Sequence, residues 1–135
     1  MKVFFDTNIL VYAAVQSDNR HAVARRLLAG GGSISVQVLN EFANVAHRKL
    51  NMRWADIRSA LRAIRASLPA LPITVAINEL ATALAEQHKF AFYDALIVAS
   101  ALEAKCTTLY SEDMNHGMTI RQSLTIINPF LPPGP

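Results

Sequence analysis

Four acidic side chains occupy positions from which they could share one site. Asp6 directly follows a short apolar run that we expect to be a buried strand, and Asp113 closely follows a second such run. The carboxyl ends of parallel strands form the ligand-binding edge of an open α/β sheet. Glu41 projects from the margin of the apolar face of a predicted helix, and Asp94 lies in the first turn of another. In a doubly wound sheet, all four carboxylates can face one crevice.

The chemistry of such a crevice follows from its charge. Two carboxylates about 4 Å apart repel by roughly 4 kcal/mol at an effective dielectric of 20, so a group of four needs protons or cations. Magnesium or manganese suits oxygen ligands, and the chain has no Cys pair or Cys/His cluster for zinc. Such a metal activates water and neutralises a phosphoryl group. We therefore predict metal-assisted phosphodiester hydrolysis, with hydrogen-bonding support from Thr7, Asn8 and Ser111.

Three of the four acids also have a plain structural interpretation. Asp6, like Thr7 or Asn8, could simply cap the helix that follows it, since all three side chains accept hydrogen bonds from helix N–H groups. Glu41 and Asp94 lie near predicted helix starts, where the helix dipole favours a negative charge. The hydrolysis hypothesis therefore depends on the four acids meeting.

Strand and helix patterns alternate along the chain. Strands are expected at 2–5, 33–36, 73–75, 107–110 and 125–127, and helices at 9–14, 21–29, 37–50, 53–67, 77–88 and 90–102. Residues 68–72 are interpreted as a connector because they contain two prolines. The alternation predicts an α/β fold, a three-layer sandwich with a mostly parallel central sheet flanked by helices.

The composition is that of one dense domain. Hydrophobic residues make up 52% of the 135 residues and charged residues 17%. We expect residues 1–128 to form a single domain and 129–135 a proline-rich tail. No apolar run is long enough for a membrane span, and charges interrupt the N-terminal run, so we expect a cytoplasmic protein that does not contact a membrane.

A basic stretch lies between residues 48 and 65, where Asp56 is the only acid. Arg58, Arg62 and Arg65 follow one flank of the predicted helix at 53–67. These arginines could bind the backbone of an RNA, or they could cover apolar surface with their stems. Trp54 is interpreted as a core residue of this helix.

The residues around the four acids also resemble the motifs of a known family. Phe-Asp-Thr-Asn-Ile-Leu at 5–10, Asn-Glu-Phe at 40–42, Tyr-Asp-Ala-Leu-Ile-Val-Ala-Ser-Ala at 93–101 and Leu-Tyr-Ser-Glu-Asp-Met at 109–114 occur in this order. With them, essentially the whole chain resembles a PIN domain of the VapC toxin type.

This resemblance implies an endoribonuclease that depends on magnesium or manganese and uses Asp6, Glu41, Asp94 and Asp113 as its acidic quartet. It also implies a toxin–antitoxin system, in which toxin subunits form a homodimer and a cognate antitoxin occupies the groove near the site. The last motif departs from the usual Thr-x-Asp, because Ser111 replaces the Thr and Glu112 adds an acid. We favour Asp113 over Glu112 as the fourth ligand.

Two other functions remain open. The chain could be a non-catalytic module that binds RNA or a protein. A metal-dependent phosphatase of the haloacid dehalogenase type would need a second Asp two residues after Asp6, where this chain has Asn8.

Overall fold

The structure is a computed structural model that describes residues 2–132. Residues 133–135, the end of the predicted tail, lie outside the described residues. The elements are, in chain order, β1 (Val3–Phe5), α1 (Thr7–Ala14), α2 (His21–Ala29), β2 (Ile34–Ser35), α3 (Val36–Arg48), α4 (Trp54–Ser67), β3 (Ala70–Leu71), α5 (Val75–His88), α6 (Phe92–Glu103), β4 (Thr108–Tyr110), β5 (Thr119–Ile120) and β6 (Leu124–Ile127).

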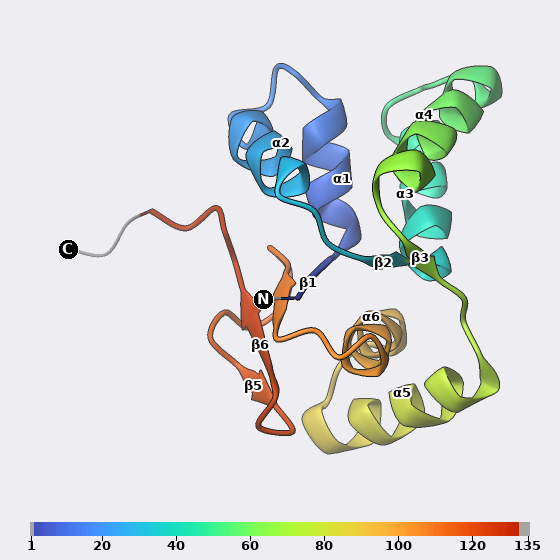
Figure 1. The fold of residues 1–135 in the computed structure, drawn as a ribbon. Coiled ribbons are helices and arrows are strands. Elements are labelled where there is room, and N and C mark those ends of the chain that lie inside the picture. Colours follow the sequence, from blue (N-terminus) through green and yellow to red (C-terminus); the bar gives the residue numbers. More distant parts are fainter. Residues whose placement is uncertain (1, 133–135) are drawn as a thin grey trace.

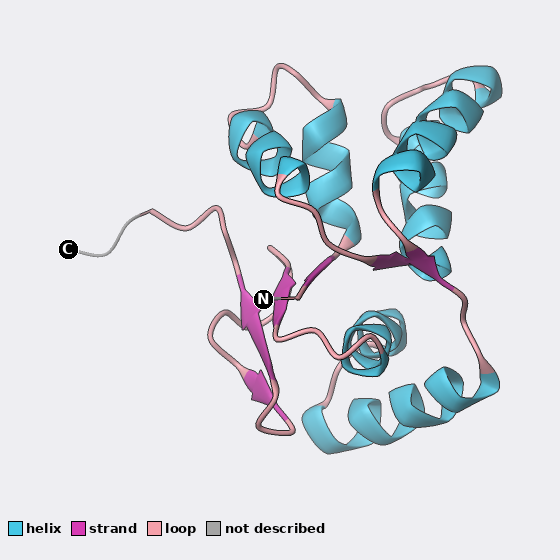
Figure 2. Ribbon diagram, in the orientation of Figure 1, coloured by secondary structure: helices cyan, strands magenta, loops and turns pink. Residues whose placement is uncertain are grey.

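The strands form a mostly parallel layer (Figure 2). The main sheet has the order β1-β4-β6-β5, and only β5 runs antiparallel to its neighbour. β2 and β3 form a separate parallel pair, which a bridge between Phe4 and Ser33 connects to β1. Two backbone hydrogen bonds support this bridge, from Ser33 N to Val3 O (2.9 Å) and from Phe5 N to Ser33 O (3.1 Å).

Helices cover this layer on two sides. In Figure 1, α1 to α4 gather on one side of β2 and β3, whereas α5 and α6 lie on the other side. Phe4 and Phe5 of β1 are fully buried between these layers, and all residues of α6 from Ala95 to Ala101 are buried as well. Small and apolar side chains cover nearly the whole circumference of α6, which is why the helix can be surrounded by protein. The predicted α/β fold with flanking helices is confirmed.

Three consecutive glycines, Gly30 to Gly32, form the end of α2 and the turn that leads to β2. Gly30 ends α2, and Gly31 has a positive φ of 84°. A Cβ atom at Gly32 would lie 2.5 Å from the ring of Phe5, so this position has no room for a side chain. The glycines therefore let the start of β2 lie close beside β1, the strand that Asp6 follows.

Two expectations about strands are wrong. No strand forms at 73–75, because Thr74 caps α5 by accepting a hydrogen bond from Ile77 N (3.1 Å) and Val75 begins that helix. The pairing falls instead within the expected connector, where Ala70–Leu71 lie between two prolines that favour extended backbone. β5 was not predicted from the sequence, because its two residues are too few to show an alternating pattern.

The interpretation of Trp54 as a core residue is also wrong. Its side chain is 51% exposed, and its ring stacks on His47 with the ring centroids 4.2 Å apart. Trp54 is the first residue of α4, and its partner His47 lies at the end of α3. In the apolar stripe of α4, only Ile57 is fully buried.

The C-terminal end of the described chain contacts α1. Phe130 packs edge-on against the ring of Tyr12, with the centroids 5.2 Å apart, and its backbone N–H donates to Asn128 Oδ1 (2.9 Å). The boundary placed at residue 128 stays a prediction. None of the helices between residues 2 and 132 has the length and apolar character needed to cross a bilayer.

Candidate active site

A cavity of about 600 Å³ opens beside the carboxyl end of β1. Its lining includes the side chains of Asp6, Glu41, Asp94 and Asp113. These four acids come from the end of β1, from α3, from the start of α6 and from the segment after β4. Four acids that are far apart in the sequence therefore face one space.

Asp6 is the most buried of the four acids, with 5% of its surface exposed. Its Oδ1 accepts a hydrogen bond from Thr7 N (2.7 Å) and caps α1, and its Oδ2 accepts one from Ser111 Oγ (2.6 Å). The pKa of Asp6 is raised to about 7. Burial is the largest cause; the two hydrogen bonds oppose it, and the charges of Asp94 and Glu41 add to it. Helix capping and a place in the cavity are thus compatible roles for one side chain.

Glu41 reaches the cavity because α3 buries its apolar face against the rest of the domain. Ser35 caps this helix by accepting a hydrogen bond from Val38 N (3.4 Å). The buried face includes Val38 and Phe42, and Glu41 lies at its margin. Thr7 Oγ1 donates to Glu41 Oε2 (2.7 Å), so Thr7 connects the start of α1 to this second acid.

Asp94 lies in the first turn of α6. Lys89, in the left-handed region with φ 62°, ends α5, and the chain then turns into the buried helix. Burial raises the pKa of Asp94, and the charges of Glu41 and Asp113 raise it further. Asp94 accepts no hydrogen bond from the described residues, so its oxygens are available to a ligand.

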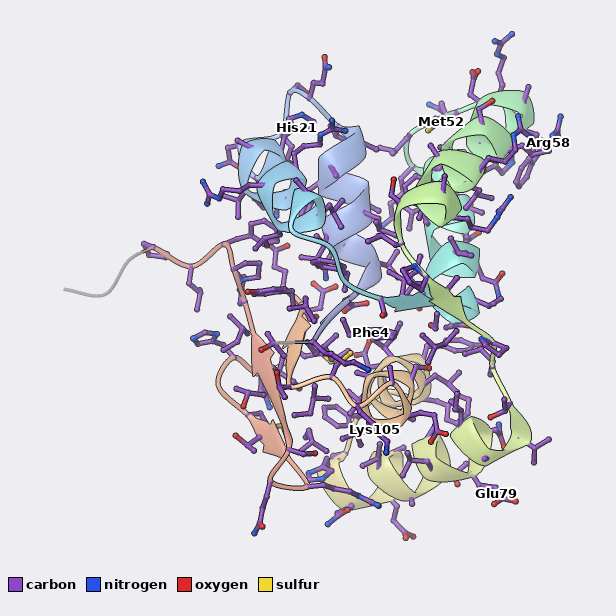
Figure 3. All side chains as sticks on the ribbon, viewed as in Figure 1. Phe4, His21, Met52, Arg58, Glu79 and Lys105 are labelled. Atoms are coloured by element: carbon purple, nitrogen blue, oxygen red, sulfur yellow. The ribbon has the colours of Figure 1, made fainter. Side chains whose placement is uncertain are left out.

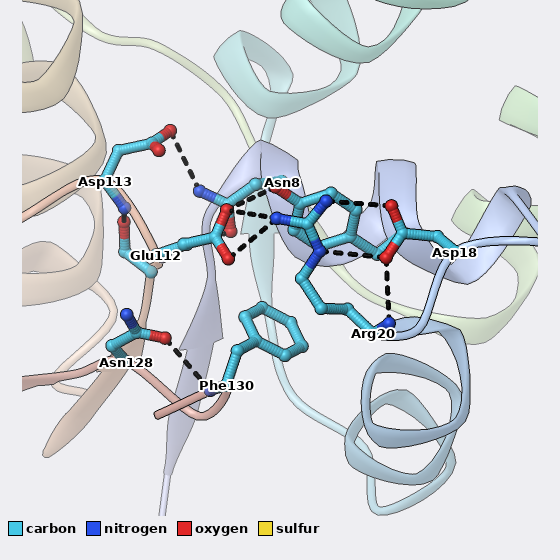
Figure 4. A network of polar contacts seen from close by, with 9 residues as sticks. Asn8, Asp18, Arg20, Glu112, Asp113, Asn128 and Phe130 are labelled. Atoms are coloured by element: carbon cyan, nitrogen blue, oxygen red, sulfur yellow. Dashed lines mark hydrogen bonds and ion pairs between the residues drawn. The ribbon is translucent and has the colours of Figure 1, made fainter. Parts of the chain in front are cut away.

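The structure distinguishes the two adjacent acids that follow β4. Asp113 lines the cavity, and its Oδ2 accepts a hydrogen bond from Asn8 Nδ2 (3.1 Å). Glu112 is not part of the lining; its carboxylate binds Arg20 Nη1 (2.9 and 3.0 Å) and the hydroxyl of Tyr12 (Figure 4). Only Asp113 of this pair therefore faces the other three acids.

Positive charge is distributed unevenly around the cavity. Lys49, at the end of α3, is the only lysine or arginine in the described lining. The predicted RNA-binding residues Arg58, Arg62 and Arg65 are exposed on α4, and none of them lines the cavity. Figure 3 shows Arg58 at the outer side of α4. The structure therefore brings the acids together but leaves these arginines elsewhere.

The four acids of the cavity provide oxygen ligands of the kind that a divalent cation needs. Within residues 2–132, no three His, Cys, Asp or Glu side chains lie close enough together to form a ready-made metal site. The four acids thus line the cavity, but their carboxylates do not converge on a single metal position. In ligand type they fit a hard cation, because all donors are oxygens. A cation would also offset the burial and repulsion that raise the pKa values of Asp6 and Asp94.

Some residues of the cavity were missed in the sequence. Tyr12 follows Asn8 by one helical turn, and Asn44 and Lys49 continue the side of α3 that carries Glu41. Helical spacing from the predicted residues could have identified them. Arg20, which does not line the cavity but pairs with Glu112, carries no such signal, because it lies in a turn and its partner is 92 residues away.

A family model matches most of the chain. The PIN domain model aligns with residues 3–117, a range that contains all four acids of the cavity. No curated protein matches the sequence.

Solved structures with the same fold include bacterial toxins. VapC20 of Mycobacterium tuberculosis, a toxin that cleaves the sarcin–ricin loop, is 24% identical, with a TM-score of 0.71 over 83% of this chain and 90% of that one. A toxin–antitoxin complex from Klebsiella pneumoniae is 22% identical, with a TM-score of 0.73 over 96% of this chain and 98% of that one. VapBC2 of Rickettsia felis, bound to a DNA fragment from its promoter, is 22% identical, with a TM-score of 0.64 over 93% and 97%.

At these identities, the structural likeness shows the fold alone. The family model adds a sequence match that begins with β1 and continues past Asp113. The chain belongs to the PIN domain family.

Proposed function

We propose that this protein is an endoribonuclease that depends on a divalent metal ion and is the toxin of a type II toxin–antitoxin pair. The observation that carries the proposal is the meeting of Asp6, Glu41, Asp94 and Asp113 in one cavity of a PIN domain. The same four residues are the proposed metal ligands, and Mg²⁺ or Mn²⁺ is the proposed ion.

The residues of the chain have separate roles in this proposal. When bound, the metal ion supplies an activated water and neutralises charge on the scissile phosphate. Ser111 and Thr7 orient the carboxylates of Asp6 and Glu41 through their hydroxyl groups. Asn8 orients Asp113 through its side-chain amide.

Substrate binding is assigned to cations near the cavity. Lys49 lines the cavity and is placed to contact a phosphate of the RNA next to the one that is cleaved. Arg58, Arg62 and Arg65 remain candidate contacts for more distant phosphates, since they are exposed and lie along one helix.

The partners follow from the structural neighbours. VapC20 cleaves the sarcin–ricin loop, and another neighbour is a toxin–antitoxin complex, so an RNA substrate and a cognate antitoxin are proposed for this chain. We also propose a homodimer of toxin subunits. The proposed site of action is the cytoplasm, where the RNA substrate is found.

One observation favours a second candidate function. The carboxylates of the described residues do not converge on a single metal position. The alternative is therefore a PIN module that binds RNA or a protein without cleaving it. The phosphatase alternative has no comparable support, since Asn8 stands where the second Asp would be needed.

Cleavage of end-labelled RNA separates the two candidates. We expect cleavage with Mg²⁺ or Mn²⁺, none with EDTA, and recovery when the metal is added back in excess. RNA that binds but stays intact under all three conditions would overturn the proposal in favour of the binding module. Asp56→Asn is a matched control, because Asp56 is exposed and pairs with Arg53 outside the cavity.

A further inference from the structure

A closed polar network forms one rim of the acidic cavity. Arg20, the residue before α2, donates from Nε and Nη2 to the two oxygens of Asp18 (2.8 Å each). Its Nη1 donates to both oxygens of Glu112 (2.9 and 3.0 Å). The guanidinium also lies over the ring of Tyr12, 3.7 Å from the centroid. All three guanidinium nitrogens and one face of the group therefore have partners (Figure 4).

This network connects segments that are distant in the sequence. Tyr12 belongs to α1, Asp18 to the turn before α2, and Glu112 to the segment after β4. Arg20 and Glu112 are 92 residues apart. The Tyr12 hydroxyl donates to Glu112, and burial followed by this hydrogen bond raises the pKa of Tyr12 to about 12. The network thus fixes Glu112 from two directions.

Glu112 lies between two residues that serve the cavity. Ser111 donates its hydroxyl to Asp6, and Asp113 lines the cavity. The backbone N–H of Glu112 donates to Asn8 Oδ1 (3.3 Å), and that of Asp113 donates to Ser111 Oγ (3.3 Å). The side chain of Glu112 instead meets Arg20 at the rim, so the two neighbouring carboxylates have different partners.

We propose that Arg20 is a positioning residue: by holding Glu112 at the rim, it fixes residues 111–113 so that Asp113 is the carboxylate presented to the metal ion. This inference rests on the proposed function, in which Asp113 is a ligand. The charge pattern agrees with it, because Arg20 is neutralised by two carboxylates and is not left to bind a phosphate. Loss of the guanidinium would leave Glu112 without its cationic partner beside Asp113, with the Tyr12 hydroxyl still donating to it.

The first test is Mn²⁺ binding without RNA, measured from the electron paramagnetic resonance signal of free Mn²⁺. We expect Arg20→Ala to weaken binding about 10- to 100-fold, the usual effect of removing a residue that orients a ligand. Arg20→Lys should have a smaller effect, because an ammonium cannot reproduce the paired hydrogen bonds. Arg26→Ala, which removes an exposed arginine of α2, is the matched control and should bind like the wild type.

A double-variant cycle shows whether Arg20 acts through Glu112. We expect Glu112→Ala to weaken Mn²⁺ binding as well, and Arg20→Ala with Glu112→Ala to bind no more weakly than the worse single variant. Effects that add fully in the double variant would overturn the inference. Glu112→Ala leaves Arg20 paired with Asp18, so this variant tests the inference even if Arg20→Ala does not fold.

Hydrogen exchange in the metal-free protein tests the positioning without any ligand. We expect the backbone amides of Glu112 and Asp113 to exchange faster in Arg20→Ala, while those of the buried helix α6 stay as protected as in the wild type. Unchanged exchange at both amides would overturn the inference. A wild type that binds no Mn²⁺ would overturn the proposed function instead, and the exchange result would still decide whether Arg20 holds this segment.

Discussion

The acidic cavity and the basic outer side of α4 differ in how they arrange charges of the same sign. The cavity gathers carboxylates from four separate elements, and hydrogen bonds from Thr7, Ser111 and Asn8 hold three of them. On α4, the arginines follow one another along a single exposed helix. Carboxylates that the fold brings together repel one another and favour the binding of a cation, whereas exposed charges are separated and screened by solvent. Chemistry is therefore expected in the cavity, and at most weak substrate binding on α4.

The largest expected effect is the loss of cleavage when one carboxylate of the cavity is replaced. Asp94→Asn should reduce RNA cleavage by at least about 100-fold, because it removes a proposed metal ligand that has no other partner among the described residues. Asp6→Asn should have a similar effect. Circular dichroism should show both variants folded, since each substitution relieves repulsion. Wild-type activity in either variant would count directly against the metal role.

The next effect is on stability in the absence of metal. The pKa of Asp6 is raised from 3.8 to about 7, so between these values the folded protein keeps a proton that the unfolded chain releases. The free energy of unfolding should therefore fall, by a few kcal/mol, as the pH rises from about 4 to about 7. Asp6→Asn should flatten this dependence in urea unfolding measured with EDTA. Identical pH slopes for the variant and the wild type would show that Asp6 is not the group responsible.

A smaller effect is expected at Lys49, the one lysine or arginine in the described part of the cavity lining. Lys49→Ala should raise KM for a short RNA by about 10-fold and leave kcat nearly unchanged, because it removes a contact to a phosphate that does not react. Steady-state cleavage of the RNA measures both constants. Arg48→Ala, which removes the neighbouring exposed arginine outside the described lining, is the matched control. A fall in kcat with unchanged KM would instead place Lys49 in the reaction itself.

The smallest effect belongs to the outer side of α4. Arg58→Ala combined with Arg62→Ala should weaken RNA binding slightly and reduce the slope of log K against log salt by about 0.7 for each lost phosphate contact. Binding is measured by fluorescence anisotropy at several salt concentrations. The arginine substitutions are made in the Asp94→Asn protein, so that the RNA is not cleaved during the measurement. An unchanged slope would indicate that these arginines only cover apolar surface with their stems.

The local pattern of the sequence predicted most of the elements and the edge of the sheet where the site lies. Asp6 and Asp113 follow strands whose apolar runs are plain in the sequence, and Asp94 begins a helix whose residues are nearly all small or apolar. That these acids meet Glu41 was a hypothesis from the expected topology and from the resemblance to PIN domains. Spacing along the chain alone does not specify such a meeting.

The features that were missed depend on contacts between distant segments. Ala70–Leu71 pair with β2 although prolines surround them, because Ile34–Ser35 offer a parallel partner. Trp54 completes an apolar stripe in the sequence, yet at the start of α4 it is half exposed and stacks on His47. The pair of Arg20 and Glu112 joins a turn to a loop, and neither has a periodic pattern.

The most direct test of the central claim is the anomalous difference map of a crystal soaked with Mn²⁺. We predict a peak inside the cavity, with carboxylate oxygens of Asp6 and Asp94 and at least one of Glu41 and Asp113 as its ligands. A peak bound only to Glu112 or to surface acids such as Asp56 would contradict the claim, as would an empty cavity at a Mn²⁺ concentration that supports cleavage.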